Sequence, residues 1–217
     1  MAALIAEFIG TFALVFVGAG AIINGQAGLL GVALAHGLTI AAFGSAFGAV
    51  SGGHFNPAVT LAMVSINKID PVRALGYIVA QVLGAILGAL VLTFAFPSDL
   101  VATARLGTPL VAQNVSIGGA IIVEAITTFA LVSVIMGTAV DGRAPKLGAL
   151  FIGLTVTLDI LCIGTLTGAA MNPARSLGPA LVSGNLENFW VYWIGPILGG
   201  VAAAVLYQGV MAHRENA

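Results

Sequence analysis

Charged residues and cysteine are both scarce in this sequence of 217 residues. Only 7% of the residues are charged, whereas a soluble domain typically has about a quarter, and the formal net charge is −1. This balance leaves no basic surface for nucleic acid, so we expect no nucleic-acid partner. The single cysteine, Cys162, excludes a disulfide within the chain and a cysteine-rich metal site. These shortages exclude a soluble enzyme, a DNA-binding protein and a disordered scaffold.

Hydrophobic residues, in contrast, make up 59% of the chain, and the mean hydropathy is +1.11. A transmembrane helix needs about 20 mainly apolar residues. Segments of about that length predict six membrane-spanning helices, over residues 4–23, 29–50, 74–96, 117–140, 147–165 and 189–211. Two further apolar stretches, 56–66 and 172–182, are too short to cross a bilayer. We therefore predict an all-α integral multi-pass membrane protein with six transmembrane helices and two half-helices.

The basic residues predict how these spans are oriented. Arg105 alone falls in a loop on one side of a six-span topology, and Arg175 lies within the second short segment. The other basic residues all fall on the opposite side: Lys68, Arg73, Arg143, Lys146 and Arg214. Because lysine and arginine are enriched in cytoplasmic loops, both termini are predicted to be cytoplasmic. Tails of only a few residues favour a prokaryotic cytoplasmic membrane.

The chain contains two copies of one unit. Glu7 and the Thr-Phe-Ala-Leu-Val segment that starts at residue 11 return at Glu124 and residue 128, an offset of 117 residues (124 − 7). The tripeptide Asn-Pro-Ala at 56–58 returns at 172–174, an offset of 116 residues (172 − 56). Each unit has three spans, an odd number, so the second copy must be inserted upside down. We therefore predict an inverted repeat, with repeat one over about 1–96 and repeat two over about 117–211.

The repeated tripeptide predicts how each short segment begins. Proline is favoured at the first helical position, and asparagine is among the best N-caps. The side-chain oxygen of each asparagine then accepts a backbone N–H of its own helix, and its amide group is left as a donor to a lumen. Each helix N-terminus also has a charge of about +0.5, so two such ends meeting in mid-membrane would repel cations but not neutral solutes. The pore residues predicted in this way are Asn56, Pro57, Ala58, Asn172, Pro173 and Ala174.

Segments 51–60 (Ser-Gly-Gly-His-Phe-Asn-Pro-Ala-Val-Thr) and 168–176 (Gly-Ala-Ala-Met-Asn-Pro-Ala-Arg-Ser) resemble the two Asn-Pro-Ala loops of the aquaporin (major intrinsic protein) family. The resemblance covers nearly the whole chain. It implies an aquaporin-like fold, a single transmembrane channel domain over residues 1–217, and a homotetramer in the lipid bilayer with one pore in each subunit. The implied function is passive transport of water or small neutral solutes, with no cofactor, no metal and no enzymatic activity.

In that family, four positions at fixed distances from the two loops form an outer constriction, the selectivity filter. They correspond here to His36, Ile160, Ala169 and Arg175, a set that resembles the tonoplast intrinsic proteins of plants and related ammonia-permeable water channels. Compared with typical water-selective members, Ile160 lacks a polar donor and Ala169 is smaller. We therefore expect a wider, more apolar filter in which His36 and Arg175 supply donors. This implies passage of ammonia, with hydrogen peroxide or urea as further candidates. This chain departs from the tonoplast pattern in one respect. In that branch a histidine in the third connecting loop is implicated in positioning the filter arginine, but residues 97–116 here contain no histidine.

Three further residues are expected to support the pore loops. Glu7 and Glu124 lie within the membrane at corresponding positions, and we expect both carboxylates to accept N–H groups from these loops. His54, beside the first Asn-Pro-Ala, either lines the cytoplasmic vestibule or holds its loop. Asp159 neighbours Ile160, so on a helix it points about 100° away from the lumen, and the sequence does not explain its charge.

Two alternative functions remain open from the sequence. A glycerol or urea facilitator would share the fold, but such channels usually have aspartate directly after Asn-Pro-Ala-Arg, where this chain has Ser176. An ion-coupled secondary transporter also uses inverted repeats and buried acids. It predicts saturable uptake, whereas a pore predicts a flux that is linear in the gradient.

Overall fold

Every regular element in the computed structural model is a helix within residues 1–143 and 147–212, the part of the chain that it describes. Two short helices, α3 (Pro57–Ser65) and α8 (Pro173–Ser183), begin directly after the two asparagines. Six others are long and apolar enough to cross a membrane: α1 (Ala2–Asn24), α2 (Gly28–Ser51), α4 (Pro71–Ala95), α6 (Ile117–Ile135), α7 (Gly148–Thr167) and α9 (Val191–Leu206). The prediction of six spans and two half-helices is therefore confirmed.

Four shorter elements complete the chain. Two π-helical turns, η2 (Met136–Val140) and η3 (Tyr207–Met211), continue α6 and α9 and extend these spans to the predicted residues 140 and 211. The other two were not predicted: the short helix α5 (Ser98–Thr103) and the 3-10 turn η1 (Arg105–Gly107), which lie in the loop between α4 and α6.

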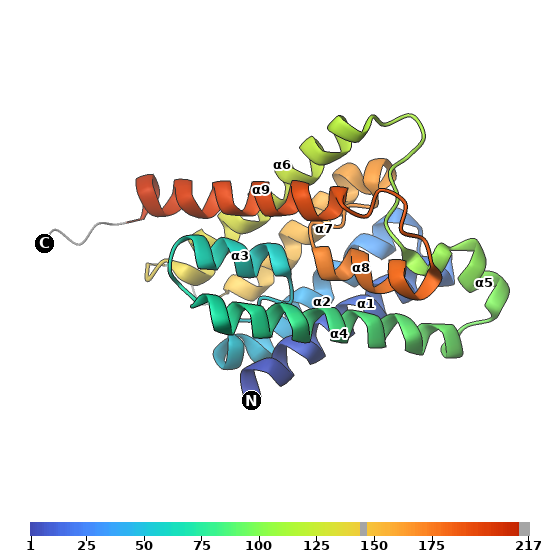
Figure 1. Ribbon diagram of the computed structural model, residues 1–217, viewed down its shortest axis with the longest axis horizontal. Coiled ribbons are helices and arrows are strands. Elements are labelled where there is room, and N and C mark those ends of the chain that lie inside the picture. The colour runs from blue at the N-terminus through green and yellow to red at the C-terminus, as the bar shows by residue number, and fades with distance from the viewer. Residues whose placement is uncertain (144–146, 213–217) are drawn as a thin grey trace, which may run out of the picture.

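The two half-helices lie in the middle of the bundle. Figure 1 shows α3 and α8 between α4 and α9, the two long helices that run along the molecule on either side of them. Corresponding helices pack alike in the two halves of the chain, α1 against α4 and α6 against α9. Each half-helix packs against the last span of the other half, α3 against α9 and α8 against α4. This exchange brings the starts of both half-helices to the centre of the molecule.

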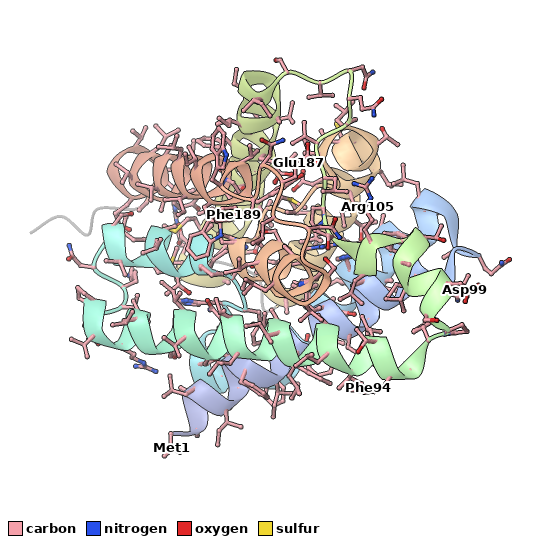
Figure 2. The ribbon with its side chains drawn as sticks, turned by 45° about the vertical axis from the view of Figure 1, so that its right-hand side comes forward. Met1, Phe94, Asp99, Arg105, Glu187 and Phe189 are labelled. Carbon is pink, nitrogen blue, oxygen red and sulfur yellow. The ribbon has the colours of Figure 1, made fainter. Side chains whose placement is uncertain are left out.

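The described basic loop residues lie at the two ends in the predicted way. Lys68 and Arg143 line one cavity, at the end where Arg73 occupies the first turn of α4. Arg105 follows α5 at the opposite end, and Figure 2 turns that end toward the viewer and labels Arg105 and Asp99 on it. The remaining two residues of the prediction, Lys146 and Arg214, lie outside the described residues.

An ion pair within the loop after η2 is hydrogen-bonded to η3, the turn that continues α9. Nε of Arg143 donates to Oδ1 of Asp141 at 2.9 Å, and Nη2 donates to Oδ2 at 2.5 Å. Nη2 of Arg143 also donates to the carbonyl oxygen of Met211 at 3.1 Å, and the Tyr207 hydroxyl donates to Asp141. The hydrogen bonds from Arg143 hold the pKa of Asp141 well below its usual value.

Candidate pore and its constriction

Each half-helix is capped by the asparagine that precedes it. Oδ1 of Asn56 accepts the N–H of Ala58 at 2.8 Å, and Oδ1 of Asn172 accepts the N–H of Ala174 at 3.0 Å. The proline that follows each asparagine occupies the first helical position, where its missing N–H costs nothing. The local sequence alone therefore sets where both half-helices start.

The same two asparagines join the pore loops to each other. Nδ2 of Asn56 donates to the carbonyl oxygen of Met171, and Nδ2 of Asn172 donates to that of Phe55, both at 2.8 Å. Phe55 and Met171 have φ values of 47° and 50°, a left-handed conformation that is uncommon for side chains of this size. A side-chain amide has two hydrogens, so each asparagine retains only one that this contact does not use. The sequence analysis had assigned the whole amide group to the lumen.

A buried carboxylate supports the first pore loop. Glu7 is fully buried, and its Oε1 accepts the Ser51 hydroxyl at 2.6 Å and the N–H of His54 at 2.9 Å. Its Oε2 accepts the N–H of Phe55 and Nε2 of Gln81, both at 2.7 Å. Four donors thus converge on one carboxylate, which fixes the backbone just before the first half-helix.

The second pore loop has the same kind of support. Glu124 is also fully buried, and its Oε1 accepts the Thr167 hydroxyl at 2.6 Å and the N–H of Ala170 at 3.0 Å. Its Oε2 accepts the N–H of Met171 at 2.8 Å. The Tyr192 hydroxyl donates to the carbonyl oxygen of Thr167 at 2.8 Å and ties the same loop to α9. Both glutamates therefore contact the loops that the sequence analysis assigned to them.

His54 both holds its loop and lines a cavity. Its Nδ1 lies 3.1 Å from Oγ1 of Thr60, and its ring packs edge-on against Tyr77 with 5.4 Å between the ring centroids. It also lines an inner cavity of about 160 Å³, together with Asn56 and Asn172. The two roles that the sequence left as alternatives are thus combined in one side chain.

The structure has a second cavity of about 380 Å³, which we call the outer cavity. It is lined by Arg175 and Ile160, by Gly107 from the loop after α5, and by Ile22 and Val32 from α1 and α2. Two of the residues predicted to form the selectivity filter, Ile160 and Arg175, thus line a cavity that is separate from the one at the asparagines. The two cavities mark the course of the candidate pore.

The structure brings His36 and Arg175, two of the four predicted filter residues, into direct contact. Nη2 of Arg175 lies 3.2 Å from Nε2 of His36, and both side chains are 3% exposed. Ile160 lines the outer cavity beside Arg175 and belongs to the same hydrophobic cluster as Ala169. Nη1 of Arg175 donates to the carbonyl oxygen of Gly107 at 3.0 Å, and its buried Nε has no partner in the described part of the chain. Arg175 also lines the outer cavity.

His36 does not act as the expected donor. Its Nδ1 lies 2.8 Å from the carbonyl oxygen of Val32, and because a carbonyl only accepts, this nitrogen must be protonated. In the neutral ring Nε2 then has only a lone pair, and it accepts a hydrogen from Arg175. Both ring nitrogens are therefore engaged by the protein, and the expectation that His36 supplies a donor to the solute is wrong. Among these side chains, Arg175 alone can donate.

The turn that holds Arg175 was not predicted from the sequence. Arg105, Leu106 and Gly107 have φ values of 46°, 54° and 68°, three left-handed residues in a row. The side chain of Leu106 is 1% exposed and packs into a core cluster with Val15, which anchors the turn. The carbonyl oxygen of Gly107, at the end of this turn, is the acceptor for Nη1 of Arg175. Gly107 itself was the one signal for this turn in the sequence.

Asp159 remains unexplained by its surroundings. Its side chain lies in α7 and is 8% exposed, and its Oδ2 has no hydrogen-bond partner within the described residues. Nothing in the structure accounts for an acidic residue at this position.

Comparisons with known proteins agree with the fold. Residues 1–207 match the family model described as Major intrinsic protein. The chain is 42% identical to mouse aquaporin-4 over 214 residues, which cover 94% of this chain and 66% of that protein, so it spans about two thirds of that relative. It is 41% identical to aquaporin TIP4-4 of Zea mays over 222 residues, which cover 96% and 86% of the two chains. The X-ray structure of the aquaglyceroporin from Plasmodium falciparum matches with a TM-score of 0.87, 28% identity and 96% coverage of both chains.

Proposed function

Because the chain belongs to the major intrinsic protein family, whose members are passive channels and not enzymes, we propose that it is a passive transmembrane channel for water. We extend the proposal to small neutral solutes such as ammonia. The observation that supports it most is the junction of two asparagine-capped half-helices, which lies at an inner cavity while Arg175 lies at an outer one.

The charges along this path explain how it would pass water and exclude ions. Each half-helix turns an N-terminus with about +0.5 of a charge toward the junction, and Arg175 adds a full positive charge at the constriction. This combination repels cations, including hydronium, and still offers hydrogen-bond donors to the oxygen of water. It is the accepted explanation of proton exclusion in aquaporin-type pores.

The filter supports the passage of neutral solutes other than water. Ile160 and Ala169 are apolar, and His36 has both nitrogens engaged, so Arg175 is the main polar group that a solute meets. A filter with few fixed donors discriminates less against ammonia, whose nitrogen accepts one hydrogen bond. A glycerol- or urea-type facilitator is the second candidate, because the aquaglyceroporin with the matching structure shares this fold.

We also propose that both termini face the cytoplasm and that the channel forms homotetramers. The first proposal is supported by Lys68, Arg73 and Arg143, which lie at the end of the bundle opposite Arg105. The second follows from the family resemblance. The plant and animal relatives give no support to the prokaryotic membrane that the sequence analysis favoured.

Stopped-flow measurements on proteoliposomes test the function. We expect water flux that is linear in the osmotic gradient, ammonia flux above that of empty vesicles, and no proton flux. Arg175→Val removes the charged donor and does not narrow the filter. We therefore expect it to raise glycerol and urea permeability roughly tenfold while water still passes. Absence of water flux in the wild type would contradict the channel, and saturable uptake abolished by an ionophore would indicate a transporter instead.

A further inference from the structure

The ring of His36 occupies a space that exists only because residue 18 is glycine. A Cβ atom built on Gly18 would lie 2.3 Å from Nε2, 2.5 Å from Cδ2 and 2.6 Å from Cε1 of this ring. Cβ atoms in real proteins almost never come closer than 3.0 Å to another heavy atom, so any side chain at position 18 must displace the imidazole. The ring therefore lies directly against the backbone of α1.

This position withdraws His36 from the constriction into the seam between α1 and α2. The outer cavity is lined by Ile22, one turn after Gly18, and by Val32, one turn before His36, whereas the His36 side chain itself is only 3% exposed. The hydrogen bond from Nδ1 to the carbonyl oxygen of Val32 holds the ring at one edge, and Arg175 contacts Nε2. The ring thus lies against α1 and is held by one contact to α2 and one to Arg175.

We propose that Gly18 is a specificity-determining residue, because it lets the His36 ring lie back against α1 and so sets the width of the selectivity filter and the place of Arg175. The inference rests on the proposed channel function. A side chain at position 18 must displace the ring, and the ring atom nearest to it, Nε2, is also the atom that contacts the Arg175 guanidinium. The displaced ring narrows the constriction and shifts the group that donates to the solute.

The experiment compares Gly18→Ala with Gly20→Ala in proteoliposomes. Gly20 lies on the same helix, but a Cβ there would face the end of the Leu92 side chain at 3.3 Å, in the contact with α4. For Gly18→Ala we expect the ratio of urea or ammonia permeability to water permeability to fall about two- to tenfold, the range set by forcing one side chain off its rotamer. Gly20→Ala should leave this ratio at the wild-type value.

A double variant separates this role from simple helix packing. In the His36→Ala background the ring is absent, so adding Gly18→Ala should change the permeability ratio no further. An effect of Gly18→Ala that persists there would overturn the inference, and so would an unchanged ratio in the single variant. Wild-type vesicles without water flux would instead refute the channel function itself, so the two failures are distinguishable.

A measurement on the wild-type protein covers the case in which Gly18→Ala fails to fold. Nitrogen NMR of the His36 ring distinguishes its tautomers. We expect a protonated Nδ1 and an unprotonated Nε2, as the contacts with Val32 and Arg175 require. A ring protonated on Nε2 instead would mean that it does not lie against Gly18 in this pose, and would overturn the inference.

Discussion

Replacing Glu124 with glutamine tests how far the second pore loop depends on a carboxylate. Oε1 of Glu124 accepts hydrogen bonds from Thr167 and Ala170, and Oε2 accepts the N–H of Met171. A glutamine that keeps its oxygen on the first two donors turns its NH₂ group toward the N–H of Met171. Because position 124 is fully buried, two donors then face each other with no acceptor between them.

The cost follows from this single lost acceptor. A buried donor without a partner costs about 1–3 kcal/mol, and the lost bond was to a charged group, which favours the upper half of that range. At about 2–4 °C per kcal/mol for a chain of this size, we expect the melting temperature to fall by roughly 4–12 °C. The carbonyl of Met171 accepts from Asn56, so a displaced loop also disturbs the junction of the half-helices, and water permeability should fall.

Thermal unfolding in detergent and stopped-flow water flux measure the two effects. Glu187→Gln is the matched control, because it makes the same chemical change at an exposed position on the turn before α9, labelled in Figure 2. A melting temperature within about 1 °C of the wild type for Glu124→Gln would refute the account of this loop.

Two further predictions concern the connecting loops. A Cβ at Gly107, whose φ is +68°, would lie 2.7 Å from the Cβ of Ala19. Gly107→Ala should therefore move the Gly107 carbonyl away from Arg175 and reduce water permeability about two- to tenfold. Water flux at the wild-type level would contradict this prediction. The pKa of Asp141 is depressed in the folded chain, so its stabilising contact is complete above the unfolded value of about 3.9 and is lost only in stronger acid. Hydrogen exchange of the amides at 141–143 should therefore be equally protected at about pH 8 and pH 5 after correction for the intrinsic rate, and faster in Asp141→Asn.

The spans were predictable because each needs only a long apolar segment, and their ends differ from the prediction by a few residues. The largest difference at a start is in α4, which begins at Pro71 instead of residue 74. Asp70 explains it: its side chain accepts the N–H of Arg73 and caps the helix, with proline at the first helical position. This Asp-Pro signal was in the sequence, and hydropathy alone does not detect it.

The turn at 105–107 was not predictable in the same way. Leu106 adopts a left-handed conformation that its own sequence does not favour, and it does so because its side chain is buried in a core formed by α1 and α4. The tautomer of His36 has the same origin. It depends on a backbone carbonyl one turn away and on Arg175, which is 139 residues further along the chain. Sequence spacing identified the residues, and only their contacts determine what they do.

The difference between the two repeats explains why the filter depends on contacts from outside its own loop. The hydroxyls of Tyr77 and Tyr192 each donate to a backbone carbonyl at the start of their pore loop. The two repeats differ four residues later, where Gln81 donates to Glu7 but Pro196 has no side-chain donor. Glu124 therefore accepts three hydrogen bonds where Glu7 accepts four, and its loop precedes α8, the helix that bears Arg175. Its guanidinium is positioned by the carbonyl of Gly107 and by Nε2 of His36, both outside the second repeat. The position of the Arg175 guanidinium is thus set by contacts from the first repeat and from the connecting loop.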